Sequence, residues 1–506
     1  MAPAVRLRAI SKRFGAVQAN REVSFDVAAG SVHGLVGENG AGKSTLMAIL
    51  YGYYHADSGS IDVNGQPAQI ANSQQAIQLG IGMVHQHFML VDTLTCLENI
   101  MLGAEGGFFL SASKAKVRAK LEALMAETGL QVRLDAVVAD LPVGELQRLE
   151  ILKALYRGAK ILILDEPTAV LTPAEATQLF HLLARLRAQG KTVLLVTHKL
   201  REIMAVTDRV TVMRQGAVVA ELDTARTSPP ELAEKMVGRS VLLRVEKVPS
   251  RPGKVLLEAA QLAVADDRGV PRVKGVSFQV RAGEIVGIAG VAGNGQSALL
   301  EALAGIRAPT AGTIRIAGQA DLGADPAQRR RLGLSHVPED RLRIGVVTAF
   351  AAEDNLILGQ QERPEFSRRG LLDRRALTEN CRRAMAEYDL RPPDPRLRLG
   401  AFSGGNQQKL VLAREIEAGP RVLLVGQPTR GVDIGAIEFI HRRLVALRDA
   451  GKAVLLVSVE LDEILGLADR ILVMAGGEIM GELPRAEATE EKLGLLMAGV
   501  RTEGGA

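Results

Sequence analysis

Nine residues near the N-terminus have the types and spacing of a phosphate-binding loop. Gly37 to Thr45 read Gly-Glu-Asn-Gly-Ala-Gly-Lys-Ser-Thr, which matches the spacing G-x-x-x-x-G-K-[ST]. In such a loop, glycines let backbone N–H groups approach phosphate oxygens at the positive end of a helix. Lys43 adds a positive charge toward the β- and γ-phosphates, and the Ser44 hydroxyl suits a Mg²⁺ ligand. The segment therefore predicts a nucleotide site.

Two carboxylates stand where a magnesium ligand and a base would be needed. Asp165 and Glu166 directly follow the apolar run Ile161 to Leu164, which is typical of a parallel strand buried on both faces. Asp165 is expected to hold the magnesium shell, and Glu166 to orient or deprotonate an attacking water. His198 ends the strand predicted from Val193 to Thr197 and is expected to contact the γ-phosphate.

A second, altered copy of the loop begins at Gly290 and reads Gly-Val-Ala-Gly-Asn-Gly-Gln-Ser. Gln296 stands there at the position of Lys43, 253 residues later, whereas Phe402 follows Leu141 by 261 residues. Matches at a fixed separation indicate an internal repeat. The change in separation places eight extra residues in the second half, between Glu339 and Phe402.

Each half has the pattern of an α/β unit, in which a short apolar strand runs into the glycine loop and an apolar-spaced helix follows. The segments 87–140 and 340–401 are predicted to be mainly helical insertions. The charged, proline-containing stretch 242–254 suits a linker, so we expect domains at 1–241 and 255–500. Buried strands are predicted at Val32–Val36, Ile161–Leu164, Val193–Val196, Ile285–Ala289, Val422–Val425 and Val454–Val457.

Composition and length set outer bounds on the function. A chain of 506 residues is expected to hold two to four domains. The net charge of +5 permits an anionic ligand but does not require nucleic acid, and we expect no nucleic-acid partner. Two distant cysteines, Cys96 and Cys381, indicate a reducing compartment. No apolar stretch reaches the roughly 18 to 20 residues that span a bilayer, so any membrane role is expected to come through a partner.

Together these motifs resemble those of ATP-binding-cassette (ABC) ATPases over nearly the whole chain. The family's signature sequence is matched by Phe402 to Gln408, Phe-Ser-Gly-Gly-Asn-Gln-Gln, and in the first half by Leu141 to Gln147, where Pro142 replaces serine. Gln86 matches the family's glutamine loop. Phe14 lies where its adenine-stacking aromatic is usually found, although a core phenylalanine fits that position equally.

The resemblance implies two tandem P-loop NTPase domains of the α/β class. Each carries a mainly helical subdomain between the glutamine loop and the signature. ATP and Mg²⁺ are the implied cofactors. The implied nucleotide ligands are Phe14, Gly37, Asn39, Gly40, Gly42, Lys43, Ser44, Thr45, Ser403, Gly404, Gly405 and Gln407; the implied catalytic residues are Lys43, Gln86, Glu166 and His198; the implied Mg²⁺ ligands are Ser44, Gln86 and Asp165.

In this family two cassettes pack head to tail, so the phosphate loop of each shares an ATP with the signature of the other. The site formed with the first loop would have every motif intact. The site formed with the second loop would lack the lysine, the magnesium carboxylate and the base, so we expect negligible hydrolysis there. The altered positions are Gln296, Glu339, Gly426, Gln427, Val459 and Pro142.

Two fused cassettes of this length resemble the ATP-binding subunit of bacterial nucleoside or simple-sugar importers. The run Gln427 to Asp433, Gln-Pro-Thr-Arg-Gly-Val-Asp, is characteristic of that group, and Val84 to Leu90 resembles its nucleoside members. Pentose or hexose import is the alternative, and a soluble translation or DNA-repair ATPase is a more distant one. An importer implies two integral-membrane permeases, an extracytoplasmic binding protein and a place at the cytoplasmic face of the membrane. The segments Phe88–Gly103 and Arg343–Gly359 would face the permeases.

Overall fold

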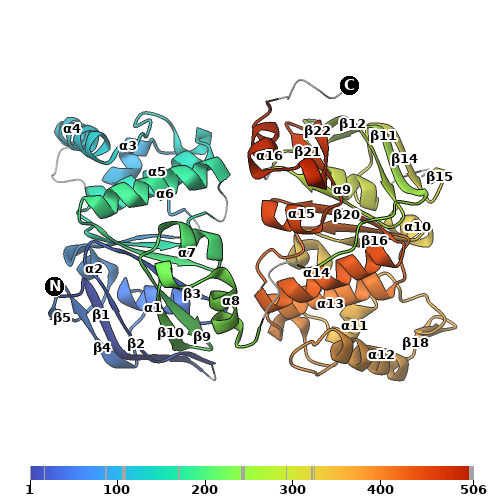
Figure 1. Cartoon of the computed structure of the whole chain (residues 1–506), viewed down its shortest axis with the longest axis horizontal. Helices are drawn as coiled ribbons and strands as arrows, with labels where there is room; N and C mark the ends of the chain where they lie inside the picture. The colour runs from blue at the N-terminus through green and yellow to red at the C-terminus, as the bar shows by residue number, and fades with distance from the viewer. Residues whose placement is uncertain are drawn as a thin grey trace. The chain divides into compact units, whose positions relative to one another are not determined.

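The computed structural model describes residues 2–500, apart from 16, 86–87, 105–109, 169–170, 172, 241–244, 292, 321–322, 324 and 433. The chain divides into two compact units, Met1–Val241 and Leu242–Ala506, drawn from blue to green and from green to red in Figure 1. Each unit contains a six-stranded sheet, a four-stranded antiparallel sheet and helices.

The six-stranded sheet of unit 1 positions the residues predicted to do chemistry. Its order is β10-β9-β3-β8-β7-β6, and β3, β8, β7 and β6 run parallel to their neighbours. Their side chains are buried throughout, as expected of apolar strands covered on both faces. The carboxyl ends of these strands therefore meet at one edge, where ligands bind in open α/β sheets. The strands are β3 Val32–Gly37, β6 Ile81–Val84, β7 Ile161–Asp165, β8 Thr192–Thr197, β9 Arg209–Arg214 and β10 Ala217–Asp223.

Unit 2 repeats this topology strand for strand, in the order β16-β19-β20-β13-β21-β22. Each predicted buried strand lies within an observed strand. The observed strands extend beyond the predicted ones by one residue, at one end or at both. The expected α/β repeat is therefore confirmed. The strands are β13 Glu284–Ala289, β16 Leu334–Val337, β19 Val422–Gly426, β20 Ala453–Ser458, β21 Arg470–Ala475 and β22 Glu478–Pro484.

Each unit also contains a four-stranded antiparallel sheet, in the orders β2-β1-β4-β5 and β12-β11-β14-β15. Alternating burial along the long strands shows that one face packs on the core and the other meets solvent. The strands are β1 Val5–Phe14, β2 Val17–Val27, β4 Ser58–Val63 and β5 Gln66–Ala68 in unit 1, and β11 Val255–Ala265, β12 Pro271–Arg281, β14 Ala311–Ile316 and β15 Gln319–Ala320 in unit 2.

The helices of unit 1 include the expected insertion. Helices α3 and α4 contact α5, the helix that follows the first signature segment, and they lie apart from the four-stranded sheet in Figure 1. The helices are α1 Lys43–Leu50, α2 Ser73–Gln78, α3 Cys96–Met101, α4 Leu110–Thr128, α5 Val143–Tyr156, α6 Pro173–Ala188, α7 Leu200–Val206 and α8 Pro229–Val237, with 3₁₀ turns η1 Val138–Asp140 and η2 Thr224–Arg226.

In unit 2, α11 and α12 likewise contact α13, the helix after the second signature. This insertion contains helices, turns and a short hairpin, β17 Ser367–Arg368 and β18 Leu371–Leu372. The helices are α9 Gln296–Ala304, α10 Pro326–Arg331, α11 Ala352–Leu356, α12 Arg374–Glu387, α13 Gly404–Glu417, α14 Ile434–Asp449, α15 Leu461–Leu467 and α16 Glu490–Met497, with a π-helical turn η3 Arg341–Gly345 and 3₁₀ turns η4 Leu399–Ala401 and η5 Arg485–Glu487. None of the described helices in either unit is long and apolar enough to cross a membrane.

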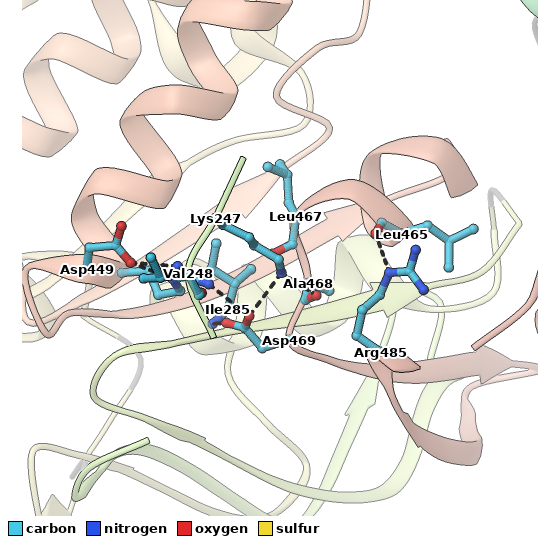
Figure 2. A network of polar contacts seen from close by, with 10 residues as sticks. Lys247, Val248, Ile285, Asp449, Leu465, Leu467, Ala468, Asp469 and Arg485 are labelled. Atoms are coloured by element: carbon cyan, nitrogen blue, oxygen red, sulfur yellow. Dashed lines mark hydrogen bonds and ion pairs between the residues drawn. The ribbon is translucent and has the colours of Figure 1, made fainter. Parts of the chain in front are cut away.

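Residues 245–254, within the expected linker, form no helix or strand, yet part of this segment is fixed to unit 2. Figure 2 shows Lys247 pointing to the turn before β21, where its ammonium donates to the carbonyl oxygens of Leu467 and Ala468 at 2.7 Å each and to Asp469 at 2.9 Å. Arg448 donates to the carbonyl oxygen of Val248 at 2.9 Å. The exact boundaries of linker and domains stay predictions.

Candidate functional site

The first phosphate loop joins the end of β3 to the start of α1. Gly42 caps α1 with a φ of 96°, which is costly for any residue with a side chain. A Cβ built on Gly42 would lie 2.2 Å from the carbonyl oxygen of Ala19, and one on Gly37 would lie 2.4 Å from that of Met213. Both positions therefore require glycine. The loop ends at the N-terminus of α1, whose free N–H groups favour an anion.

Lys43 is held against this loop. Its ammonium donates to the carbonyl oxygens of Gly37 at 2.7 Å and Glu38 at 3.0 Å, and the residue is only 6% exposed. Burial lowers the pKa of Lys43, while the charges of Glu166, Asp165 and Glu38 act to raise it. A buried cation thus lies beside the position that the loop geometry assigns to phosphate.

Ser44 and Asp165 form a pair that suits a hard cation. Asp165 ends β7, and its carboxylate accepts a hydrogen bond from the exposed Ser44 hydroxyl. Burial raises the pKa of Asp165, and the Ser44 hydrogen bond opposes that rise. One hydroxyl and one carboxylate at a phosphate loop are oxygen donors of the kind that Mg²⁺ takes beside nucleotide phosphates.

Glu166 and His198 form the second polar pair of the site. His198 Nδ1 lies 2.8 Å from Glu166 Oε1. Burial alone would raise the pKa of Glu166, but the hydrogen bond from His198 and the charges of His198, Lys43 and Lys199 together lower it. Glu166 has a positive φ of 47°, and its N–H donates to the Val196 carbonyl oxygen at 2.8 Å. The carboxylate is therefore ionised and held in one orientation, as a general base requires.

The remaining predicted residues of unit 1 lie around the loop. Asn39 and Gly40 are exposed at its tip, and Thr45 is half-buried on α1. Phe14, at the end of β1, is 42% exposed and meets Tyr54 edge-on at 5.1 Å, so it is not a core residue. Its stacking on adenine stays a prediction. Gln86 lies outside the described residues.

The two signature segments differ in how they begin their helices. Ser403 caps α13, and the Asn406 side chain donates to its hydroxyl at 2.9 Å. Gln407 is buried and donates to the carbonyl oxygens of Leu399 and Phe402, so its side chain braces this turn. Pro142 caps α5 without any side-chain hydrogen bond. Gly404 is half-buried and Gly405 is buried at the start of α13.

The second phosphate loop keeps the backbone of the first without its charge. Gly295 caps α9 with a φ of 103°, close to that of Gly42. The Gln296 amide donates to the carbonyl oxygen of Val291 at 3.1 Å and lies over Gly290, where Lys43 lies over Gly37 in unit 1. The positive charge beside the loop is therefore replaced by a neutral amide.

The altered residues at the strand ends of unit 2 also meet. Gln427 has a φ of 47°, and its N–H donates to the Val457 carbonyl oxygen at 2.8 Å, repeating the backbone of Glu166. The Val459 N–H donates to Gln427 Oε1 at 3.2 Å. Glu339 accepts hydrogen bonds from Ser297 and Gln427. The described part of unit 2 thus preserves the scaffold of the site but holds no carboxylate at the position of the base.

Sequence reasoning missed one residue that supports the first loop from a neighbouring strand. Asn20, on β2, is fully buried and donates to the Gly42 carbonyl oxygen at 3.0 Å. It fixes the loop just before Lys43. No spacing rule links Asn20 to the loop, because only the packing of β2 beside it brings the two together.

Comparison with known proteins agrees with this geometry. The family model described as ABC transporter matches residues 20–169 and 273–430. The nucleoside import ATP-binding protein NupA of Lactococcus lactis subsp. cremoris is 46% identical, covering 97% of each chain. The guanosine import ATP-binding protein NupO of Bacillus subtilis is 46% identical, covering 97% of this chain and 96% of its own. The ribose import ATP-binding protein RbsA 1 of Rubrobacter xylanophilus is 41% identical, covering 99% of each.

Proposed function

The chain belongs to the ABC transporter family, and on that premise we propose that it is the ATP-hydrolysing subunit that powers nucleoside import across a membrane. The observation that carries the proposal is the group of polar side chains that the structure describes around the first phosphate loop. Lys43, Ser44, Asp165, Glu166 and His198 meet at one sheet edge. Two relatives at 46% identity over nearly the whole chain are named for nucleoside and guanosine import.

ATP is bound by the first loop through its backbone N–H groups, with the Lys43 ammonium toward the β- and γ-phosphates. We assign Ser44, Asp165 and Gln86 as the protein ligands of Mg²⁺. The hydroxyl and carboxylate at the loop support this assignment. When bound, the ion neutralises phosphate charge that develops during transfer. Phe14, with its exposed ring, is assigned to stack on the adenine.

Hydrolysis requires a water oxygen to bond to the γ-phosphorus while the bond from that phosphorus to the β–γ bridging oxygen breaks. Glu166 is placed to accept the proton of that water, because its carboxylate is ionised and fixed by His198. His198 holds the carboxylate and lies near the position expected for the γ-phosphate. Losing a positioned general base costs about 10²- to 10⁴-fold in rate. Gln427 occupies the equivalent position in unit 2, so we assign hydrolysis to unit 1.

We assign Ser403, Gly404 and Gly405 of the unit 2 signature as ATP-binding residues. This part of the proposal rests on the role that the signature sequence has in the family. The capped start of α13 and the bracing by Gln407 give that turn a fixed form. Pro142 at the equivalent position in unit 1 offers neither hydroxyl nor N–H to a phosphate.

Membrane permeases are the partners of an import subunit, and we propose that two of them dock on the segments after the glutamine-loop positions. Val91 and Val347 are 44% and 38% exposed, and each N–H donates at 2.8 Å to a fully buried asparagine, Asn99 and Asn355 respectively. Other exposed apolar side chains occur in the same segments, Met89 in unit 1 and Ile344 and Phe350 in unit 2. Several exposed apolar residues in one segment suit an apolar contact. The subunit would then lie at the cytoplasmic face, and an extracytoplasmic binding protein would deliver the nucleoside.

Simple-sugar import is the second candidate, because a ribose importer subunit is 41% identical over 99% of the chain. Either function would use the ATP site described above, and the two differ in the ligand that the partners carry. Only a transport measurement can distinguish nucleoside import from sugar import.

Uptake of labelled nucleosides tests the proposal. Cells with the chain and its permeases should take up purine or pyrimidine nucleosides, and cells with the Lys43→Ala variant should lose that uptake. Ribose and galactose serve as the comparison ligands. If the variant lost only sugar uptake, the transported substrate would be assigned as a sugar. Unchanged uptake of every ligand would refute the import role.

A further inference from the structure

Gly426 ends β19 in unit 2 at the position where Asp165 ends β7 in unit 1. A Cβ built on Gly426 would lie 2.5 Å from Cγ of Glu339 and 2.8 Å from Cδ1 of Leu300. The Glu339 side chain thus passes through the space that an aspartate at 426 would need. Only glycine is compatible with Glu339 in this position.

The Glu339 carboxylate takes the hydrogen bond that the missing aspartate would have taken. Ser297, the second residue of α9, donates to Glu339, just as Ser44, the second residue of α1, donates to Asp165. Strand β16 pairs in parallel with β19, with Val337 opposite Val425. The carboxylate that meets the helix serine therefore comes from the neighbouring strand end.

Gln427 is part of the same arrangement. Its Oε1 accepts from the Val459 N–H at 3.2 Å, and its side chain also hydrogen-bonds to Glu339. The amide therefore bridges the β20 end and the relocated carboxylate. A glutamate at 427 would place a second negative charge against Glu339 and would lose the donor. The amide at 427 is thus the partner that Glu339 requires.

The two units also differ in how they place carboxylates around the loop. Unit 1 has Glu38, Asp165 and Glu166 around the Lys43 ammonium. The equivalent positions of unit 2, Val291, Gly426, Gln427 and Gln296, are neutral, and Glu339 supplies a carboxylate there. Ser297 is exposed, and a Cβ built on Gly293 in the loop would meet no atom within 4 Å. Gly293 and the Ser297 side chain are therefore accessible to a ligand.

We propose that unit 2 binds a Mg²⁺-nucleotide through Ser297, the counterpart of Ser44, and through Glu339, which stands at the position of Gln86 and replaces the strand-end aspartate as the carboxylate ligand, and that it binds this nucleotide without hydrolysis. The residues at 339, 426 and 427 then compensate for one another. Gly426 leaves room for the Glu339 side chain, and the neutral Gln427 hydrogen-bonds to the Glu339 carboxylate. The inference rests on the proposed function, since it assumes that the first loop binds ATP. Glu339 keeps a carboxylate available as a magnesium ligand, whereas the neutral Gln427 cannot act as the base.

The test is photolabelling of the full chain with 8-azido-ATP over a series of Mg²⁺ concentrations, with the label mapped to peptides of each unit by mass spectrometry. Label on unit 2 should rise with Mg²⁺. Glu339→Gln should raise the half-maximal Mg²⁺ concentration on the order of 10- to 100-fold, the range found for residues that support metal sites. Glu491→Gln, which removes an exposed carboxylate of α16, is the matched control and should change nothing.

A paired exchange distinguishes relocation from damage to the fold. Gly426→Asp alone should lose the Mg²⁺-dependent label, because the new side chain collides with Glu339. Gly426→Asp combined with Glu339→Ala removes the Cγ that collides, leaves the new strand-end aspartate as the carboxylate near Ser297, and should restore the label. Absent or Mg²⁺-independent label on unit 2, or an unchanged midpoint in Glu339→Gln, would overturn the inference. Label on unit 1 reports separately on the proposed function.

Discussion

Glu166 and Gln427 occupy equivalent positions with the same backbone geometry, although only Glu166 can act as a base. Both have a φ of 47°, and both donate their N–H to a β-strand carbonyl oxygen at 2.8 Å. A positive φ costs a residue with a side chain of order 1–3 kcal/mol and is retained only where the surroundings require it. Unit 2 retains this backbone although its side chain is neutral. The strained turn therefore orients whichever side chain occupies it, and at this position only unit 1 presents a carboxylate that can act as a base.

The His198 contact predicts a shift in pH dependence. The base acts when ionised, so turnover falls as pH drops through the pKa of Glu166. Because the hydrogen bond and charge of His198 lower that pKa, His198→Ala should raise it and move the acid limb of the kcat profile to higher pH. Exposed His181 on α6 is the control, and His181→Ala should leave the limb in place. An acid limb that stays put or moves to lower pH in His198→Ala would contradict the assignment.

At the scale of elements, apolar runs and loop spacing were sufficient to predict the strands and the first phosphate loop. Ile161 to Leu164 has no polar residue to interrupt it, and the glycines of the loop leave few alternatives. The Glu339–Ser297 pair was not predictable, because it depends on β16 lying beside β19 and on the side chain that Gly426 lacks. Asn20 and the π-helical turn at Arg341–Gly345 give no compositional signal either.

That π-helical turn accounts for part of the length difference between the units. Asn355 follows Asn99 by 256 residues, whereas Gly290 follows Gly37 by 253. The two asparagines make the same clamp on a valine eight residues earlier. Three of the eight extra residues of unit 2 therefore precede Val347, in the segment that contains the π-helical turn. The remainder lie between the clamp and the signature, where the β17–β18 hairpin is found.

Equivalent arginine–aspartate pairs in the two units should differ in their effect on stability. Arg448 and Asp469 are 1% and 10% exposed, whereas Arg187 and Asp208, 261 residues earlier, are 42% and 40% exposed. Removing one partner of a buried pair costs about 3–5 kcal/mol, and exposed pairs contribute about 0–1 kcal/mol. Arg448→Met should therefore lower amide protection in β20 and β21 much more than Arg187→Met does in β8 and β9, measured by hydrogen exchange. Equal losses would mean that burial of the pair is irrelevant.

For the molecule as a whole, the clamped valines should couple hydrolysis to transport. Val91→Glu and Val347→Glu place a charge on the proposed permease contact without touching the phosphate loops. Each should reduce nucleoside uptake severalfold while the purified chain keeps its ATP turnover. Val219→Glu, at a 37% exposed valine on β10, is the matched control and should support normal uptake. Normal uptake with both clamp variants would exclude these valines from the coupling surface.

The central claim is that hydrolysis belongs to unit 1, and ATP turnover of the purified chain tests it most directly. Glu166→Gln should reduce kcat by about 10²- to 10⁴-fold, as expected for loss of a positioned base. Gln427→Ala should cause a much smaller loss, because that position has no base to lose. Comparable losses in the two variants, or near-normal turnover in Glu166→Gln, would contradict the claim.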